Sequence, residues 1–280
     1  MCDTGRYRMP YFCWGAGPPL VFVHGAGDVS RSFVMVMSRL SAHFRCVGYD
    51  LPSGHGDGAV LRRYTHDDLV GDLWALLDRL GLDRAYLLGS SFGSTITLQA
   101  MRQRPNRVPR AVLQGGLARR RLRVLERLFG WAFRRCPGPT GKLPRRTRML
   151  ELVHQPAFAR QSPEVWQAYV EWTGEARLAA LGYQAKWLHG LDLRSNLPQV
   201  RQPVLLVVGD RDSVVPRPYA EVLLGGLPNA GMAVIEGAGH VPYYSHPEAM
   251  AEVVRRFLTP PGQGCGGREA CEHHPTSSSA

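Results

Sequence analysis

The sequence predicts an α/β fold, with a mostly parallel twisted sheet and helices on both faces. Short apolar runs typical of buried strands alternate with segments of helical periodicity. These runs end near His24, Asp50, Gly89, Gly115, Gly209 and Gly237. The chain has 280 residues, 44% of them hydrophobic, which is enough for one large core, and we expect no second independent domain.

Capping residues mark the boundaries of two helices. Thr65 followed by Asp68 matches a capping box, and leucines recur at helical spacing from there to a stop at Gly81. The last helix is expected to begin at Pro247, because proline is favoured at the first helical position. Its apolar positions are Met250, Val253, Val254 and Phe257.

The alternation of strands and helices is interrupted between residues 117 and 195. This stretch contains four of the six tryptophans and many helix formers but no convincing strand, so we expect a helical insertion. The α/β core would then be formed by residues 1–116 and 196–260. Residues 261–280 are rich in glycine and serine and are predicted to be disordered. They include four residues of the types that bind metals: Cys265, Cys271, His273 and His274. Their spacing is irregular, which disfavours a metal site.

The motif Gly89-Ser90-Ser91-Phe92-Gly93 lies between a strand-like run and a helix-like segment. A tight strand–turn–helix connection holds the serine at its apex in a strained, exposed position that suits a nucleophile. Side chains at either glycine would collide with neighbouring backbone at so sharp a turn. Glycine is common in this chain, so the motif alone only suggests a catalytic serine, and an ordinary turn residue is the alternative.

Three other strand ends carry residues that suit the same chemistry. Upstream of the motif, an apolar strand runs into a glycine-rich turn, His24-Gly25-Ala26-Gly27. Downstream, one buried-type strand ends in Asp210-Arg211-Asp212 and another leads to His240. A serine, an aspartate and a histidine therefore follow one another along the chain, each at the end of a predicted strand.

With this order of Ser91, Asp212 and His240, the sequence resembles the α/β-hydrolase family over about residues 11–258. The resemblance implies a Ser-His-Asp triad and a helical cap, formed by residues 117–195, over the serine. One departure follows Asp50, where the glycine-rich loop carries one extra residue.

The chemistry assigns a role to each member of the triad. A serine hydroxyl needs a general base at neutral pH, and the imidazole of His240 titrates near neutrality and can return the proton to a leaving group. The other ring nitrogen needs a carboxylate, for which Asp210 and Asp212 compete. Asp212 fits the family spacing better, because Gly209 precedes it by three residues and an apolar pair and Pro216 follow it.

The resemblance also implies an oxyanion hole and a substrate pocket. The backbone amides of Ala26 and Phe92 are expected to receive the negative charge on the substrate carbonyl. We expect the substrate pocket to include Gly25, Trp131 and Val241. His24 is interpreted as a hydrogen-bonded scaffold residue behind the oxyanion turn. No cofactor and no metal are expected.

The sequence thus predicts a serine hydrolase that cleaves an ester with an apolar acyl group through an acyl-enzyme. A C–C bond hydrolase of ring-cleavage products remains an alternative, because it uses the same three residue types. A non-catalytic small-molecule or lipid-binding protein on the same fold is a further alternative. The sequence has no apolar stretch long enough to span a bilayer and does not open like a signal peptide, so we expect a cytoplasmic location.

Positive charge is concentrated between Arg102 and Arg148. This segment holds 15 lysine and arginine residues and one acid, Glu126, whereas the whole chain has a net charge of +11. Residues 119–135 fit one basic amphipathic helix, with arginines on one face and apolar residues such as Leu125 and Phe129 on the other.

Three interpretations of this basic helix remain open. In the first, its apolar side covers the active site and its arginines face water. In the second, it attaches the protein to a membrane surface. In the third, it binds nucleic acid, which is disfavoured because no recognised nucleic-acid motif accompanies it.

Overall fold

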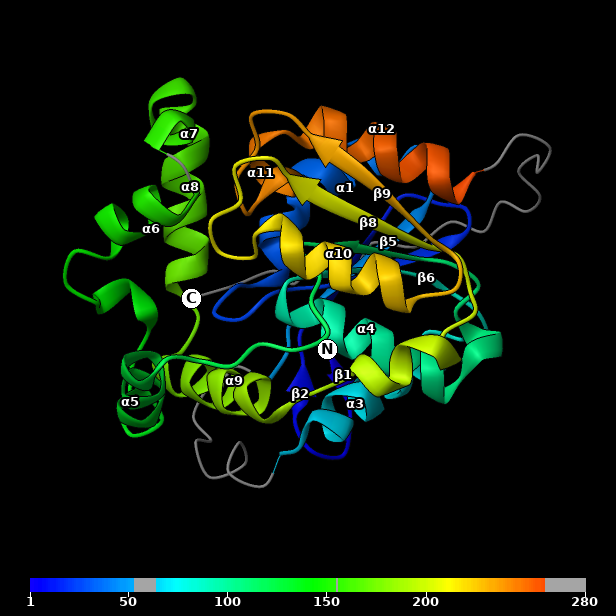
Figure 1. The fold of residues 1–280 in the computed structure, drawn as a ribbon, viewed down its shortest axis with the longest axis horizontal. Helices are drawn as coiled ribbons and strands as arrows, with labels where there is room; N and C mark the ends of the chain where they lie inside the picture. Colours follow the sequence, from blue (N-terminus) through cyan, green and yellow to red (C-terminus); the bar gives the residue numbers. More distant parts are fainter. Residues whose placement is uncertain (53–63, 155, 260–280) are drawn as a thin grey trace, which may run out of the picture.

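The computed structural model describes residues 1–52, 64–154 and 156–259, and a seven-stranded sheet crosses the described part of the chain (Figure 1). The strand order is β3-β5-β4-β6-β7-β8-β9, with β3 antiparallel to β5 and the other pairs parallel. The strands are β3 (Tyr11–Trp14), β4 (Pro19–Val23), β5 (Arg45–Tyr49), β6 (Tyr86–Ser90), β7 (Ala111–Gln114), β8 (Val204–Gly209) and β9 (Ala230–Ile235). The predicted mostly parallel α/β sheet is confirmed.

A small sheet of β1 (Cys2–Asp3) and β2 (Arg8–Met9) was not predicted, because two-residue strands leave no periodicity to detect.

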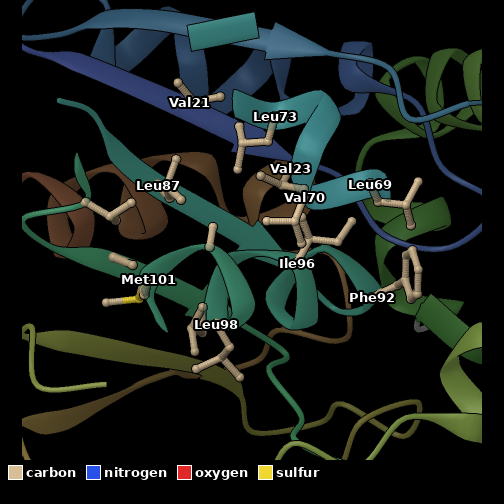
Figure 2. Packing of buried hydrophobic residues seen from close by; sticks show 14 of the residues in the cluster. Val21, Val23, Leu69, Val70, Leu73, Leu87, Phe92, Ile96, Leu98 and Met101 are labelled. Atoms are coloured by element: carbon tan, nitrogen blue, oxygen red, sulfur yellow. The ribbon is translucent and has the colours of Figure 1, made fainter. Parts of the chain in front are cut away.

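Helices cover both faces of the sheet. The two faces bury different residues of the same strand, since successive side chains point to opposite sides. Val21 and Val23 of β4 pack in one cluster with the helices on that face, and Figure 2 shows this packing against Leu73 and Ile96. Leu20 and Phe22 pack in the other cluster. The first face carries α3 (His66–Arg79), α4 (Phe92–Gln103) and α10 (Arg217–Gly226), and the second carries α1 (Val34–Leu40), α11 (Pro242–Ser245) and α12 (Pro247–Leu258).

The predicted helix boundaries agree with the structure. The hydroxyl of Thr65 accepts a hydrogen bond from the Asp68 amide, and the Thr65 amide donates to the Asp68 carboxylate at 2.7 Å, so the capping box is present. After α3, Gly81 has a φ of +65°, a left-handed conformation that glycine adopts without steric cost. Helix α12 begins at Pro247, as predicted.

Five helices lie between β7 and β8 in the chain, within the part of the insertion that the structure describes. They are α5 (Val124–Phe133), α6 (Arg146–His154), α7 (Pro156–Gln161), α8 (Pro163–Gly174) and α9 (Leu178–Gly190). Figure 1 shows them gathered beyond the carboxyl ends of β8 and β9. Aromatic contacts hold them to the core at two places. The ring of Tyr169 lies 5.1 Å from that of Tyr244 in α11, and Trp187 stacks on Phe92 at 6.4 Å.

The predicted basic helix over residues 119–135 is wrong in its extent. Helix α5 begins at Val124, because the Glu126 carboxylate accepts from the Arg123 amide at 2.7 Å and caps the helix there. Upstream, Arg119 forms an isolated bridge with Asp192 instead. The exposure of the apolar side contradicts the first of the three interpretations, in which that side covers the active site: Leu125 is 67% and Phe129 59% exposed.

Three further features of the chain are its lack of apolar stretches that could span a membrane, its expected lack of a metal site and its predicted disordered tail. No helix in the described ranges is both long and apolar enough to cross a membrane. Within those same ranges, no group of three or more histidine, cysteine or acidic side chains could hold a metal ion. The residues of the predicted disordered tail, including Cys265, Cys271, His273 and His274, lie outside the described residues, as does most of the glycine-rich loop after Asp50.

Candidate active site

Ser91 sits at a strained turn between β6 and α4. Its backbone has φ 49° and ψ −115°, a conformation that non-glycine residues rarely adopt. A Cβ on Gly93 would lie 2.1 Å from the carbonyl oxygen of Val23, and one on Gly89 would lie 2.4 Å from the hydroxyl oxygen of Thr97. The close approach of strand and helix therefore requires both glycines, as the sequence predicts.

Hydrogen bonds to the backbone of Ser91 hold this turn in place. The Ser91 amide donates to the carbonyl oxygen of Gln114 in β7 at 2.9 Å. The hydroxyl of Ser94 donates to the carbonyl oxygen of Ser91 at 2.6 Å and accepts from the amide of Leu117. The strained conformation is thus fixed by the neighbouring strand and by the first turn of α4.

His240 and Asp212 form a buried hydrogen-bonded pair. Nδ1 of His240 donates to Oδ2 of Asp212 at 2.8 Å. The other carboxylate oxygen accepts from the amides of Val214 and Val215, at 2.8 and 2.9 Å. A carboxylate with three donors is fixed in position, and it holds the imidazole with its lone pair on Nε2. Asp210, the competing acid, is exposed and lies outside this pair.

Space for the pair comes from a glycine. Gly115 has a φ of +52°, and a Cβ built there would lie 3.0 Å from Cε1 of His240 and 3.5 Å from Oδ2 of Asp212. Any larger residue at this position would push against the imidazole.

Gln114, next to this glycine, is a site residue that sequence reasoning missed. Its side chain is fully buried and joins two loops of the site. Oε1 accepts from the hydroxyl of Ser90 at 2.6 Å, and Nε2 donates to the carbonyl oxygen of His240 at 3.0 Å. One signal was available: a polar residue at the end of a buried strand must find partners, and the loops nearby supply them.

The predicted oxyanion turn packs against Ser91. A Cβ on Gly25 would lie 3.4 Å from the Cβ of Ser91, so glycine permits the close approach of the turn. The amide of Gly27 donates to Oε1 of Gln184 in α9 at 2.9 Å, a contact that the sequence did not indicate. Phe92 is the first residue of α4, where an amide has no acceptor within its own helix.

His24 serves as scaffold behind this turn, in agreement with its interpretation from sequence. One ring nitrogen, Nδ1, lies 2.8 Å from the carbonyl oxygen of Gly25. The other, Nε2, accepts from the amide of Leu51 at 2.9 Å. Both nitrogens are occupied, so this histidine is not available for proton transfer.

A cavity of about 90 Å³ opens at Ser91 and His240. Of the residues expected in the pocket, Gly25 and Val241 line this cavity, and Ala26 of the expected oxyanion hole lines it too. Trp131 does not: it is 52% exposed and lines a separate groove between α5 and α9. The expectation that Trp131 forms part of the pocket is therefore wrong, because the packing of α5 places this side chain in the groove beside α9.

The walls of this cavity are more polar than the sequence predicted. Arg146 of α6 is 7% exposed, and it donates to the carbonyl oxygen of Val170 at 2.8 Å and to the hydroxyl of Thr173 at 2.6 Å. Asp28 accepts from the hydroxyl of Tyr243 at 2.9 Å, and burial raises the pKa of its carboxyl group. A buried acid and a buried guanidinium thus share the cavity with apolar side chains.

The family described as alpha/beta hydrolase fold matches residues 18–247. This match spans six of the seven strands of the sheet, the strained serine turn and the His240–Asp212 pair. The chain belongs to the α/β-hydrolase fold family.

Among curated proteins, the chain is similar to an enzyme named pimeloyl-[acyl-carrier protein] methyl ester esterase from Aromatoleum aromaticum. The two are 32% identical over 85% of this chain and 96% of that protein. It is also 30% identical to the dihydrolipoyllysine-residue acetyltransferase component of an acetoin cleaving system from Pseudomonas putida, over 91% of this chain and 68% of that protein.

Solved structures share the fold at lower identity. A hydrolase from Pseudomonas aeruginosa superposes with a TM-score of 0.78 at 23% identity, covering 89% of this chain and 94% of the other. An esterase from Thermogutta terrifontis gives 0.77 at 22% identity, covering 89% and 92%. A meta-cleavage product hydrolase from Pseudomonas fluorescens gives 0.71 at 19% identity, covering 89% and 93%. At these identities the likeness concerns the fold.

Proposed function

We propose that the protein is a serine hydrolase that cleaves a carboxylic ester through an acyl-enzyme. One observation carries the proposal. Ser91, in its strained turn, and His240, which is joined to Asp212 at 2.8 Å, line the same small cavity. The similarity to an enzyme named as a methyl ester esterase supports the reaction type.

The proposed acylation begins when Nε2 of His240 takes the proton of the Ser91 hydroxyl, as Oγ attacks the ester carbonyl carbon. Negative charge on the carbonyl oxygen is received by the backbone amides of Phe92 and Ala26. His240 then gives the proton to the alcohol oxygen, the C–O bond breaks and the acyl group stays on Ser91. Asp212 stabilises the charged imidazolium throughout.

Deacylation repeats these steps with water. Nε2 of His240 takes a proton from a water molecule, whose oxygen attacks the acyl carbon. The bond between that carbon and Oγ of Ser91 breaks, Oγ recovers a proton from His240 and the carboxylic acid leaves. No cofactor takes part in the proposed reaction.

The cavity favours a short acyl group over a long apolar one. Its volume of about 90 Å³ leaves room for a few heavy atoms at Ser91, whereas a long acyl chain would need a much larger apolar tunnel. Arg146 and Asp28 in its walls suit an acyl group with a polar substituent. We therefore revise the expected apolar acyl group to a short one.

A fluorophosphonate probe and a series of p-nitrophenyl esters from acetate to decanoate test the proposal. We expect mass spectrometry to find the label on Ser91, faster turnover of the short esters, and a loss of at least about 10³-fold in kcat for Ser91→Ala. Ester turnover that survives in Ser91→Ala contradicts the proposal. Turnover of a ring-cleavage product but of no ester favours the C–C hydrolase, and ligand binding without turnover favours the non-catalytic alternative.

A further inference from the structure

Exposed apolar side chains of the described residues concentrate on one short helix, α5. Eleven large apolar side chains are exposed in the described part of the chain, and five of them belong to this helix. They are 52% to 68% exposed: Val124, Leu125, Leu128, Phe129 and Trp131. A group of apolar side chains this dense on the surface indicates an interaction site, because single exposed apolar residues are common but contiguous patches are not.

The way α5 packs explains why these side chains face outward. Gly130 of α5 and Gly182 of α9 meet at the contact between the two helices. A Cβ on Gly182 would lie 2.6 Å from the carbonyl oxygen of Gly130 and 2.7 Å from the amide nitrogen of Arg134. The helices therefore approach backbone to backbone along a narrow line. Among the described residues, no protein surface covers the larger apolar side chains of α5.

The charges around these apolar residues are almost all positive. Arg121, Arg123, Arg127 and Arg135 are exposed on and beside the helix. Its one acid, Glu126, is 3.1 Å from Arg120 and also caps the helix, so its charge is compensated. The guanidinium of Arg135 lies over the ring of Trp131 at 4.0 Å, next to the apolar residues.

A groove of about 510 Å³ between α5 and α9 has the same character. Leu122, Val124, Leu128, Trp131 and Ala185 provide apolar walls. Arg127, Arg134 and Lys186 provide positive charge, and no acidic side chain of the described residues lines the groove. An apolar surface bordered by cations suits a lipid ligand, because the apolar part can contact acyl chains while the cations contact anionic head groups.

We propose that α5 binds the surface of an anionic lipid bilayer, with its apolar side chains inserted among the acyl chains and its arginines at the head groups. Val124, Leu128 and Trp131 line the groove, and Leu125 and Phe129 are exposed on the same helix. Fluid acyl chains can follow such an uneven surface more readily than a rigid protein surface can. Nucleic acid would contact the arginines but would leave the leucines and Phe129 exposed to water. The proposal does not depend on the catalytic role of Ser91.

Sedimentation of the full-length protein with vesicles tests this proposal. We expect binding to phosphatidylcholine vesicles that contain about 30% phosphatidylglycerol, weak binding to phosphatidylcholine alone, and weaker binding as salt rises. The triple variant Arg123→Gln, Arg127→Gln and Arg135→Gln should bind about a hundredfold more weakly, roughly fivefold for each charge removed. The double variant Leu125→Ser and Phe129→Ser should bind at least about tenfold more weakly.

Two matched controls separate this surface from general effects of charge and exposure. Arg8→Gln with Arg79→Gln and Arg201→Gln removes the same charge from exposed sites on other elements, and it should bind within about twofold of wild type. Val222→Ser with Val234→Ser removes exposed apolar groups, 49% and 43% exposed, elsewhere. Thermal melts followed by circular dichroism report whether each variant is folded.

The proposal is overturned if the wild-type protein stays in solution with anionic vesicles. It is also overturned if the α5 variants and the control variants weaken binding equally. Absence of vesicle binding together with α5-dependent binding to polyglutamate overturns it in favour of an acidic protein partner.

Discussion

The side-chain amide of Gln114 donates to the carbonyl oxygen of His240 at 3.0 Å. The same side chain accepts from the hydroxyl of Ser90, and its backbone carbonyl accepts from the amide of Ser91. One buried residue of β7 therefore fixes the loop of the proposed base and the turn of the proposed nucleophile. We infer that Gln114 is a positioning residue, which acts through Ser91 and His240 and does not itself touch substrate.

Replacing Gln114 by methionine should slow the reaction more than it weakens substrate binding. Methionine fills a similar volume but removes the hydrogen bonds that Gln114 makes to the Ser90 hydroxyl and the His240 carbonyl, at a cost of about 2–4 kcal/mol in the free energy of unfolding. We expect kcat for a short ester to fall at least about tenfold, with KM within about twofold. Steady-state kinetics and urea unfolding measure the two effects.

Gln99→Met is the matched control for this change. Gln99 is also largely buried, but its side chain donates to the carboxylate of Asp67 in α3 at 3.2 Å. It should lose stability while keeping its kcat. A fall in kcat in both variants, in proportion to lost stability, would show that Gln114 has only a structural role.

Exchanging the carboxylates for amides should distinguish Asp212 from Asp210. Asp212→Asn keeps the shape of the side chain but removes the charge that fixes the imidazole, so we expect kcat to fall by about 10⁴-fold. Asp210→Asn changes an exposed side chain and should leave kcat within about twofold. Equal losses in the two variants, or the larger loss in Asp210→Asn, would contradict the assignment of Asp212.

The turn at Ser91 should tolerate no side chain at Gly93. A Cβ there would lie 2.1 Å from the Val23 carbonyl, so Gly93→Ala must separate α4 from β4 and should destabilise the protein by more than about 4 kcal/mol. Gly225→Ala, inside α10 with no atom within 4 Å of the added Cβ, should instead stabilise it by about 1 kcal/mol. Thermal unfolding of both variants tests the contrast, which similar melting temperatures would refute.

His66 should make the protein sensitive to acid. Its Nε2 lies 2.9 Å from the hydroxyl oxygen of Thr95, whose own proton goes to the carbonyl of Phe92, so Nε2 carries the hydrogen. Nδ1 is buried and has no hydrogen-bond partner among the described residues, and burial lowers the pKa of His66 to about 4. The pKa of His66 is lower in the folded than in the unfolded state, so folding favours the neutral imidazole. Its contribution to the free energy of unfolding is complete above about pH 6.5 and is lost as the pH falls toward 4. This loss amounts to at most about 3 kcal/mol.

His66→Gln keeps a donor to Thr95 but does not titrate. Its free energy of unfolding should therefore fall less steeply than that of wild type between about pH 6.5 and pH 4. Urea unfolding at several pH values measures both slopes. Parallel curves for the two proteins would mean that His66 is not responsible for the acid sensitivity.

Much of the fold and of the candidate site could be predicted from local patterns. The apolar run before Ser91 and the glycines around it predict the sharp turn of the backbone at this serine. The Thr65–Asp68 capping box predicts where α3 begins. These features depend on residues close together in the chain. They are readable because steric limits on the backbone act locally.

The contacts of the helical insertion could not be predicted in this way. Periodicity showed that residues 119–135 have an apolar side, but it could not show which side would meet another helix. The meeting of Gly130 with Gly182 left Leu125 in solvent and kept Trp131 away from the cavity. The burial of Arg146 beside Ser91 likewise depends on how α6 packs against α8.

The sequence by itself determined the alternation of the main strands and helices and the strained serine turn, because these follow from the conformational limits of neighbouring residues. The resemblance to the α/β-hydrolase family indicated the three candidate triad residues. Only the tertiary structure decided that Gln114 and Gln184 hold the site loops, that the cavity is small and partly polar, and that α5 exposes its apolar side. These properties arise from contacts between segments far apart in the chain, and their packing is set by shape, which no local pattern encodes.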